Sequence, residues 1–424
     1  MNLLQLINSL KNFLQLKKNY LQNFVWRAIQ LGGRQVVMFS ILFISAKLLP
    51  STQFGIYNYL LAFVVLFTLL ADFGMSRAIS RFVAEYNITQ KEKVNYILFN
   101  SGIILLILIA LFTCILLIFA EDIVGENYNL IVYLIPTFVF LPLTSLFDGF
   151  YSGLKKFKLI SYVSTISGVI SIPATYFLVS KYQLIGAFLS LDLYYLLLFI
   201  LLLIFHRNYV FRFNRELFLR IWKYSAIIGI SSIGHFFYAK ANIIILGKFN
   251  FFNEVGYLEI IDKVFIMLAF PFIIFGQIIS PRITELKTEN KHEMISSYFR
   301  KILYYSIPLS LIITIIMWFA FPIAIKTFLS EYYSTNFINM FKLLIINLPL
   351  LLITNSLSQP FIIATGAAKY SLLTIPFGVL NVVLAILLIA QFGYIGAVYS
   401  ILITSIISKL LTYYLVYKNL SRDL

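Results

Sequence analysis

Two arginines, Arg27 and Arg34, lie seven residues apart in an apolar stretch near the start of the chain. Both precede Asp72, the first acidic residue of the sequence, so their stretch contains no carboxylate of its own. Seven residues are nearly two turns of an α-helix, which places both side chains on about the same helical face. A guanidinium remains charged and donates two parallel hydrogen bonds, which suits a phosphate group. The pair therefore indicates an anion-binding site.

Each of these arginines also has an alternative role. Arg27 is near enough to the end of the stretch for its side chain to reach the aqueous interface. Arg34 lies deeper, where a charged side chain costs about 2.5–3.5 kcal/mol on insertion scales. It would either face a polar cavity or neutralise a buried acid such as Asp192 or Asp262. We expect the cavity for Arg34.

Lys240 and His235 are the corresponding candidates in the second half of the chain. Lys240 lies near the middle of an apolar run and is expected either to bind an anion or to pair with an acid. His235 could change charge near neutral pH, but packing beside a serine or a carbonyl fits its position equally well. Five residues separate the two, about 140° around a helix, so they need not share a face.

Asp192, on the helix predicted at 184–205, and Glu259 and Asp262, on the helix predicted at 256–280, are the candidate acids inside the membrane. Glu259 and Lys263 stand at i,i+4 with the glutamate first, the favourable order for an ion pair within one helix. We interpret that pair as structural. Asp192 and Asp262 are candidates either as partners of basic residues or as proton-coupling groups for transport.

The sequence contains none of the motifs that bind nucleotides or catalytic metals. It has no P-loop, no His-Glu-x-x-His and no Cys/His cluster at metal-ligand spacing. Its one cysteine, Cys114, cannot form an intrachain disulfide. We therefore expect no catalytic residues, no metal, no cofactor and no ATP-driven pumping by this chain alone.

The composition indicates an integral membrane protein. Hydrophobic residues make up 61% of the 424 residues and charged residues 12%, and the mean hydropathy is +0.91. A soluble domain carries about 25% charged residues. Apolar runs of helical length, without alternating strands, predict an all-α polytopic bundle rather than an outer-membrane β-barrel.

Twelve transmembrane helices are predicted, six in each half of the chain. They cover residues 24–49, 55–76, 97–120, 129–150, 159–180, 184–205, 222–247, 256–280, 302–325, 338–364, 371–390 and 394–417. The predicted domains are an interfacial amphipathic helix (1–22), a six-helix half (23–206), a basic cytoplasmic linker (207–221) and a second six-helix half (222–424).

The basic residues are distributed unevenly between the two sides of the predicted bundle. Of 33 lysines and arginines, 24 fall in segments on the side of the termini and four in the loops of the other side. Because basic residues collect in cytoplasmic loops, both termini are predicted to be cytoplasmic. The net charge of +16 then reflects the topology of a multi-pass protein of the cell (inner, cytoplasmic) membrane, and not nucleic-acid binding.

A weak internal repeat supports two related halves. At an offset of 201 residues, glycines and charged residues recur in the pairs Gly33 and Gly234, Lys47 and Lys248, Gly55 and Gly256, and Arg81 and Arg282. Segments 182–187 and 392–397, before the sixth and twelfth predicted helices, also correspond. An even number of helices per half makes the halves parallel, related by a pseudo-two-fold axis along the membrane normal. Transporters built in this way usually bind substrate between the halves.

Several short motifs occur in order along residues 23–420. The stretch from Lys47 to Tyr86 reads Lys-Leu-Leu-Pro, Phe-Gly-Ile-Tyr, an apolar run, Ala-Asp-Phe-Gly-Met and Arg-Phe-Val-Ala-Glu-Tyr. Later motifs are Asp148-Gly149-Phe150-Tyr151-Ser152-Gly153-Leu154, Leu246-Gly247-Lys248-Phe249, Val255-Gly256-Tyr257 and Pro281-Arg282-Ile283-Thr284-Glu285-Leu286. Together they resemble the polysaccharide (oligosaccharide) flippases of the multidrug/oligosaccharidyl-lipid/polysaccharide exporter superfamily. One departure is Asn242, where many relatives have an acid.

This resemblance implies a flippase that moves polyprenyl-diphosphate-linked oligosaccharides from the cytoplasmic to the outer leaflet by alternating access. The expected pathway is the biosynthesis of a surface polysaccharide such as O-antigen, capsule or exopolysaccharide. The expected partners are this lipid-linked oligosaccharide, membrane lipids and the glycan polymerase machinery, without nucleic acid. A diphosphate with several sugars cannot cross hydrocarbon unaided, so such a protein needs a polar, cationic cavity but no covalent chemistry.

Three other functions fit the sequence less well. A drug or organic-cation exporter of the same superfamily would favour carboxylates in the first-half cavity, whereas the first predicted helix is basic. A membrane glycan polymerase or ligase typically presents a large outer loop, whereas the predicted outer loops are short. A structural scaffold would have no reason to retain deep charges such as Arg34 and Lys240.

Overall fold

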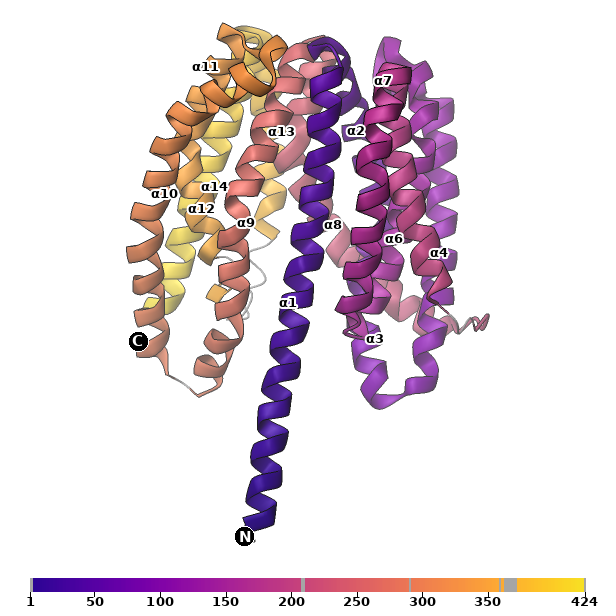
Figure 1. The fold of residues 1–424 in the computed structure, drawn as a ribbon, viewed down its shortest axis with the longest axis vertical. Coiled ribbons are helices and arrows are strands. Elements are labelled where there is room, and N and C mark those ends of the chain that lie inside the picture. Colours follow the sequence, from indigo (N-terminus) through magenta and orange to yellow (C-terminus); the bar gives the residue numbers. More distant parts are fainter. Residues whose placement is uncertain (1–2, 207–209, 290, 358–359, 362–371, 423–424) are drawn as a thin grey trace. The chain divides into compact units, whose positions relative to one another are not determined.

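The computed structural model describes residues 3–206, 210–289, 291–357, 360–361 and 372–422 (Figure 1). Every regular element given a range in this part of the chain is helical. The α-helices are α1 (Leu3–Leu48), α2 (Ser51–Asp72), α3 (Met75–Thr89), α4 (Lys91–Ile118), α5 (Ala120–Val124), α6 (Ile135–Gly153), α7 (Phe157–Ile204), α8 (Arg215–Lys248), α9 (Phe252–Thr288), α10 (His292–Phe328), α11 (Thr335–Leu344), α12 (Leu348–Leu357), α13 (Thr374–Phe392) and α14 (Tyr394–Arg422). Three 3-10 helices are η1 (Gly125–Leu134), η2 (Ser330–Tyr332) and η3 (Ile345–Asn347).

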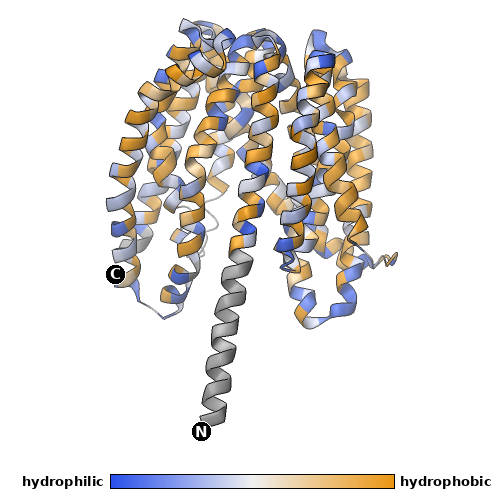
Figure 2. Ribbon diagram, viewed as in Figure 1, coloured by the Kyte–Doolittle hydropathy of each residue, from blue (hydrophilic) through white to orange (hydrophobic). Residues whose placement is uncertain are grey.

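The surfaces of these helices are suited to lipid. Eleven segments of the described chain are long and apolar enough to cross a membrane. On α10, Ile312, Ile315, Ile316 and Phe319 are each more than half exposed, and such a continuous apolar face would be unfavourable in water. Figure 2 shows apolar residues along the helices and hydrophilic residues at the connection between α3 and α4. The predicted fold class, an all-α polytopic membrane protein, is confirmed.

Helix α7 contains two crossing segments. Its 48 residues would extend about 72 Å as one straight helix, more than twice the thickness of a bilayer core. At Gln183 the backbone leaves the helical conformation, with φ 48° and ψ −123°. A Cβ atom on Gly186 would lie 2.0 Å from the carbonyl oxygen of Leu178, a contact that requires the chain to reverse. The predicted helices at 159–180 and 184–205 are therefore the two legs of α7, so each of the twelve predicted helices has a helical counterpart.

The same reversal recurs 210 residues later, between α13 and α14. Gly393 has φ 63° and ψ −145°, and a Cβ atom on Gly396 would lie 2.1 Å from the carbonyl oxygen of Leu388. The two turns thus bring the same pair of positions into contact, through the segments whose sequences correspond. This agreement supports the internal repeat.

Internal contacts divide the chain into two compact units. Unit 1 contains Met1–Ile44, Phe67–Ile118 and Val132–Gly229, and unit 2 contains Ser45–Leu66, Phe119–Ile131 and Ile230–Leu424. In unit 1, α6 packs against α3, α4 and α7. Helices α3 and α6 approach closely because Gly149 and Gly153, one turn apart on α6, lie against the backbone of Ser76 and Ser80. In unit 2, α12 packs against α9 and α10, and α13 packs against α14.

Unit 2 also brings together the first turns of α2 and α9, which are related by the 201-residue repeat. A Cβ atom on Gly55 would lie 1.7 Å from the carbonyl oxygen of Phe252, and one on Gly256 would lie 3.5 Å from that of Ser51. The 201-residue repeat relates these two contacts to each other, because Gly55 corresponds to Gly256 and Ser51 corresponds to Phe252. The Thr52 hydroxyl lies 2.9 Å from Asn253 Oδ1, its own counterpart, so a local two-fold axis passes between these two side chains.

The predicted domain boundaries at 22, 206 and 221 remain predictions. The two contact units are defined by packing, whereas the predicted halves are defined by sequence repetition, so the units do not test these boundaries. Residues 3–22 of the first predicted segment lie within α1, which runs without interruption from Leu3 to Leu48. Its predicted position in the membrane interface also remains a prediction.

The turn at Gln183 provides a stability test. Its backbone conformation is one that glycine adopts readily and other residues adopt at a cost of about 1–3 kcal/mol. We expect Gln183→Gly to raise the thermal unfolding temperature of the purified protein. The matched control is Lys181→Gly, at an exposed helical position, which is expected to lower stability by up to about 1 kcal/mol. Equal losses in both variants would contradict this backbone conformation.

Candidate functional site

Arg34 lies at the centre of a polar cluster in unit 1. Its helix α1 packs closely on α7, since a Cβ atom on Gly168 would lie 2.3 Å from a methyl group of Val37. One turn away, Arg34 Nε donates to Ser164 Oγ at 2.9 Å. The two terminal nitrogens form a bidentate pair with Asp148 of α6, and the contact from Nη2 to Oδ1 measures 2.8 Å. The whole guanidinium fork is therefore engaged within the protein.

This ion pair bears on the two roles that the sequence left open for Arg34, which were facing a polar cavity and neutralising a buried acid. The structure shows an acid partner, and that partner is Asp148 rather than Asp192 or Asp262. That Arg34 faces a polar cavity remains a prediction beside this ion pair. In the sequence, Asp148 stands out only as part of a motif near the end of a predicted helix. The role of Arg34 in binding substrate remains a prediction, in which phosphate has to compete with Asp148.

Arg27 belongs to the same cluster but has no carboxylate partner among the described residues. Its Nη1 donates to Gln30 Oε1 at 2.8 Å, one turn along α1, and to Ser152 Oγ of α6 at 3.4 Å. The guanidinium also lies 5.4 Å from the ring centre of Phe157. Two arginines and one aspartate leave this cluster with a net positive charge. Arg27 is therefore the residue of this cluster with charge available for an anion.

Lys240 is held between two acids in unit 2. Its ammonium nitrogen lies 2.7 Å from Glu259 Oε2 and 2.9 Å from Asp262 Oδ2, both on α9. Glu259 also pairs with Lys263 at 3.3 Å, the i,i+4 pair expected from the sequence. Two positive and two negative charges cancel, so this group has the character of a structural ion-pair network. Lys240 could bind an anion or pair with an acid, and Asp262 could pair with a basic residue or serve in proton coupling. The structure shows the two residues paired with one another.

His235 and Asp192 have local partners. The imidazole of His235 packs against Tyr238, with ring centres 6.3 Å apart. Asp192 Oδ1 accepts hydrogen bonds from the backbone N–H of Thr137 at 2.7 Å and from its hydroxyl at 2.6 Å. Thr137 is in the first turn of α6, so Asp192 caps that helix N-terminus from α7. A coupling role for Asp192 remains a prediction beside this structural one.

Asn242 lies in a closed network of neutral side chains. Its Nδ2 donates to Asn381 Oδ1 at 3.1 Å, and its Oδ1 accepts from Ser400 Oγ at 2.6 Å. Asn381 in turn donates to the carbonyl oxygens of Phe237 and Tyr238. Each amide group thus has partners without a net charge. This explains how the chain accommodates an asparagine where many flippases are expected to have an acid.

Lys409 of α14 was not among the predicted site residues. Its side chain is only 7% exposed, and Nζ donates to Asn347 Oδ1 of η3 at 2.8 Å. No ion pair of Lys409 is found in the described part of the chain. In the sequence, Lys409 lies in an apolar run that has no acid at helical spacing. Arg34 and Lys240 are more central in their apolar runs and were therefore the stronger candidates. Among the described residues, no group of three or more His, Cys, Asp or Glu could hold a metal ion.

The protein has the fold of the multidrug/oligosaccharidyl-lipid/polysaccharide (MOP) superfamily. An inward-facing multidrug resistance MATE family transporter of the MOP superfamily aligns with a TM-score of 0.76 at 14% identity, covering 94% of this chain and 98% of that one. The lipid II flippase MurJ aligns with a TM-score of 0.72 at 15% identity, covering 94% and 89%. A MOP superfamily transporter from Pyrococcus furiosus, described as having a binding pocket of reverse polarity, aligns at 0.57 and 15%, covering 95% of each chain. These identities establish the fold alone.

Residues 20–287 match the polysaccharide biosynthesis protein family, over more than half of the chain. The chain therefore belongs to this family, as the resemblance of its motifs indicated. Among curated proteins, none matches the sequence significantly.

The pair between Arg34 and Asp148 predicts a rescue experiment. Arg34→Ala leaves a largely buried carboxylate without its partner, and we expect a loss of stability of up to about 3–5 kcal/mol together with lower membrane abundance. Arg34→Ala combined with Asp148→Asn should regain most of that stability, measured by thermal unfolding of the purified protein. Arg27→Ala is the matched control, because Arg27 has no ion pair to break. A double variant no more stable than Arg34→Ala would contradict the assignment.

Proposed function

We propose that this protein is a flippase that translocates polyprenyl-diphosphate-linked oligosaccharides from the cytoplasmic to the outer leaflet of the cell membrane. Membership of the polysaccharide biosynthesis protein family, in a chain with a transporter fold, is the observation that carries this proposal. The pathway it would serve is the synthesis of a surface polysaccharide such as O-antigen, capsule or exopolysaccharide, together with the glycan polymerase machinery. Both termini are proposed to be cytoplasmic, from the distribution of basic residues alone.

The charges inside the helices support an anionic substrate. The polar cluster of unit 1 keeps a net positive charge through Arg27. In unit 2, Lys240 is neutralised but Lys409 has no acid partner in the described part of the chain. Buried positive charge attracts a diphosphate and repels an organic cation, which makes the drug-exporter alternative less suitable.

The connections between helices support transport without covalent chemistry. In the described part of the chain, the connections from α2 to α7, from α8 to α9, from α10 to α12 and from α13 to α14 are short turns and short helical segments, without a separate folded domain. A membrane polymerase or ligase needs a site at which glycosyl groups are held and transferred outside the hydrocarbon. We therefore propose that the protein is not an enzyme.

Reconstituted vesicles test the substrate class directly. We expect purified protein to move a fluorescent polyprenyl-diphosphate oligosaccharide between leaflets, measured as the fraction of label that a membrane-impermeant quencher or glycosidase reaches. Vesicles without protein are the control for spontaneous movement. A cationic dye should not be transported under the same conditions. Transport of the dye without transport of the lipid would favour the drug-exporter alternative.

The contact between α2 and α9 tests alternating access. Thr52 belongs to the first sequence half and Asn253 to the second, and their side chains touch at 2.9 Å. In a Cys114→Ser background, oxidation of the Thr52→Cys/Asn253→Cys variant should join the halves and stop transport, and a reductant should restore it. In the proposed cycle, the two sequence halves separate at this contact.

A second cysteine pair provides the control. Ser306 and Ser356 lie 3.4 Å apart on α10 and α12, within the second half. Oxidation of Ser306→Cys/Ser356→Cys should therefore leave most of the transport rate intact. Undiminished transport by a fully cross-linked Thr52→Cys/Asn253→Cys protein would exclude a cycle in which this contact opens.

A further inference from the structure

Lys409 is a buried lysine whose one hydrogen-bond partner among the described residues is neutral. Its ammonium donates to Asn347 Oδ1 at 2.8 Å, and Asn347 Nδ2 donates to Ser405 Oγ at 2.7 Å. The side chains of Asn347 and Ser405 are 7% and 5% exposed, so this group is largely screened from water. An ammonium has three donors, and a single amide oxygen satisfies one of them.

No carboxylate in the described part of the chain pairs with Lys409. The chain has 17 acidic residues, and in the described part none forms an ion pair with Lys409. Asp423 alone lies outside that part, fourteen residues further along the sequence and beyond the end of α14. By contrast, Arg34 and Lys240 are each matched by acids on neighbouring helices. Lys409 is thus the buried helix cation that would gain most from an incoming anion.

The elements packed against this part of α14 contribute no second charge that is buried. Helices α12 and α13 and the η3 segment contain no charged residue at all. Lys342 on α11 is exposed and lies over the Trp318 ring. Two tyrosine hydroxyls belong to this region: Tyr413 follows Lys409 by one turn of α14, and Tyr238 of α8 is hydrogen-bonded to Ser408, the residue before Lys409.

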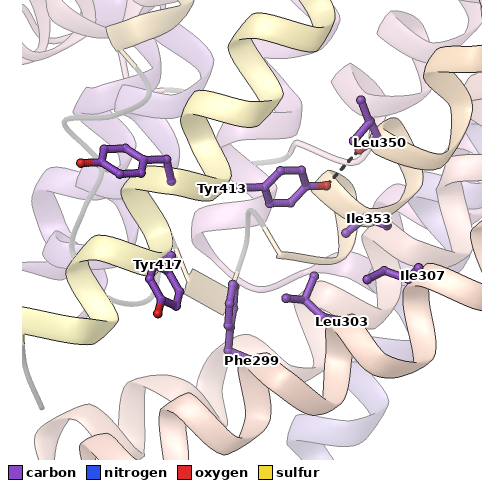
Figure 3. Close-up of a pocket in the computed structure, with 8 residues that line it drawn as sticks. Phe299, Leu303, Ile307, Leu350, Ile353, Tyr413 and Tyr417 are labelled. Atoms are coloured by element: carbon purple, nitrogen blue, oxygen red, sulfur yellow. Dashed lines mark hydrogen bonds between the residues drawn. The ribbon is translucent and has the colours of Figure 1, made fainter.

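An apolar pocket begins one helical turn from Lys409. Tyr413, four residues further along α14, lies on the same helical face and lines a cavity of about 440 Å³ between α10, α12 and α14 (Figure 3). Phe299 and Ile307 of α10 and Ile353 of α12 form other walls. The hydroxyl of Tyr413 is bonded to the carbonyl oxygen of Leu350 at 3.2 Å, so the ring presents its apolar face to the pocket. A cation beside an apolar pocket is the arrangement that an anionic lipid requires.

We propose that unit 2 binds the polyprenyl diphosphate end of the substrate, with a phosphate group at Lys409 and part of the isoprenoid chain in the pocket between α10, α12 and α14. This inference rests on the proposed function and extends it to a defined binding site. The phosphate supplies the negative charge that Lys409 lacks, and its oxygens accept the remaining ammonium donors. The apolar walls take hydrocarbon without leaving a polar group unpaired. The sugars need not contact this site.

Three probes separate the two parts of the site: inorganic diphosphate, a polyprenol, and the corresponding polyprenyl diphosphate. Binding to purified wild-type protein in lipid nanodiscs is measured for each. We expect polyprenyl diphosphate to bind most tightly, because it alone occupies both parts. Equal affinity for polyprenol and polyprenyl diphosphate would overturn the role of Lys409. Equal affinity for inorganic and polyprenyl diphosphate would overturn the role of the pocket.

Two variants, each with a matched control, test which residues form the phosphate contact and which form the isoprenoid pocket. Lys409→Met should weaken polyprenyl diphosphate binding about tenfold to a hundredfold and leave polyprenol binding unchanged. Its control is Lys342→Met, which replaces an exposed lysine. Ile307→Trp, at the half-exposed rim of the pocket, should weaken polyprenol and polyprenyl diphosphate equally. Its control is Ile315→Trp, on the same helix but outside the pocket.

Thermal unfolding distinguishes a binding role of Lys409 from a structural one. Because Lys409→Met removes an unmatched buried charge, we expect this variant to unfold at the same or a higher temperature than wild type without ligand. It should also lose the stabilisation that inorganic diphosphate gives to the wild type. A lower unfolding temperature with unchanged diphosphate stabilisation would show that Lys409 is structural and would overturn the proposal.

The outcome is separable from that of the proposed function. If wild-type protein transports the lipid-linked oligosaccharide but Lys409→Met and Ile307→Trp bind polyprenyl diphosphate like wild type, only this site is wrong. If wild-type protein binds polyprenyl diphosphate through Lys409 but moves no oligosaccharide, the flippase proposal fails and the site stands.

Discussion

A charge buried in a membrane-spanning bundle has to be neutralised where it lies, and this constraint governs the interior of the protein. Arg34 and Lys240 obey it through acids on neighbouring helices, Asp148 on α6 and the pair Glu259 and Asp262 on α9. Each ion pair also fixes the rotation of the two helices that it joins, since a small rotation would leave both charges unmatched. The charges are therefore part of the packing as much as of any binding site.

The second determinant of the structure is duplication. The turns at Gln183 and Gly393 reverse the chain in the same way, although only one of them contains glycine at the strained position. The α2 and α9 turns meet through contacts that the 201-residue repeat exchanges, and glycine is required at Gly55, because a side chain there would strike the backbone of Phe252. Tyr332 adds a hydrogen bond to the Leu49 carbonyl in the same unit, and burial raises the pKa of its hydroxyl, so it remains a donor at physiological pH.

The sequence predicts the helices because each apolar run has the length of a membrane crossing, and the gap between the helices predicted at 159–180 and 184–205 falls at the turn around Gln183. The sequence alone does not predict which acid pairs with each buried basic residue. Asp148 is 114 residues from Arg34, and nothing in the spacing distinguishes it from Asp192. Asp192 instead serves the N-terminus of α6, a role that depends on where α7 places it. Such pairings are decided by helix packing, which a single sequence does not encode locally.

The contrast between paired and unpaired cations bears on how a diphosphate would be held. A phosphate arriving at Arg34 has to displace Asp148, so the gain from the new contact is offset by the loss of the old one. A phosphate arriving at Lys409 displaces no carboxylate and removes the cost of an unmatched charge. In the proposed cycle, Lys409 would therefore contribute more to affinity, whereas Arg34 would exchange between two partners at little net change. A transporter benefits from both kinds of site, because a substrate bound tightly everywhere would not be released.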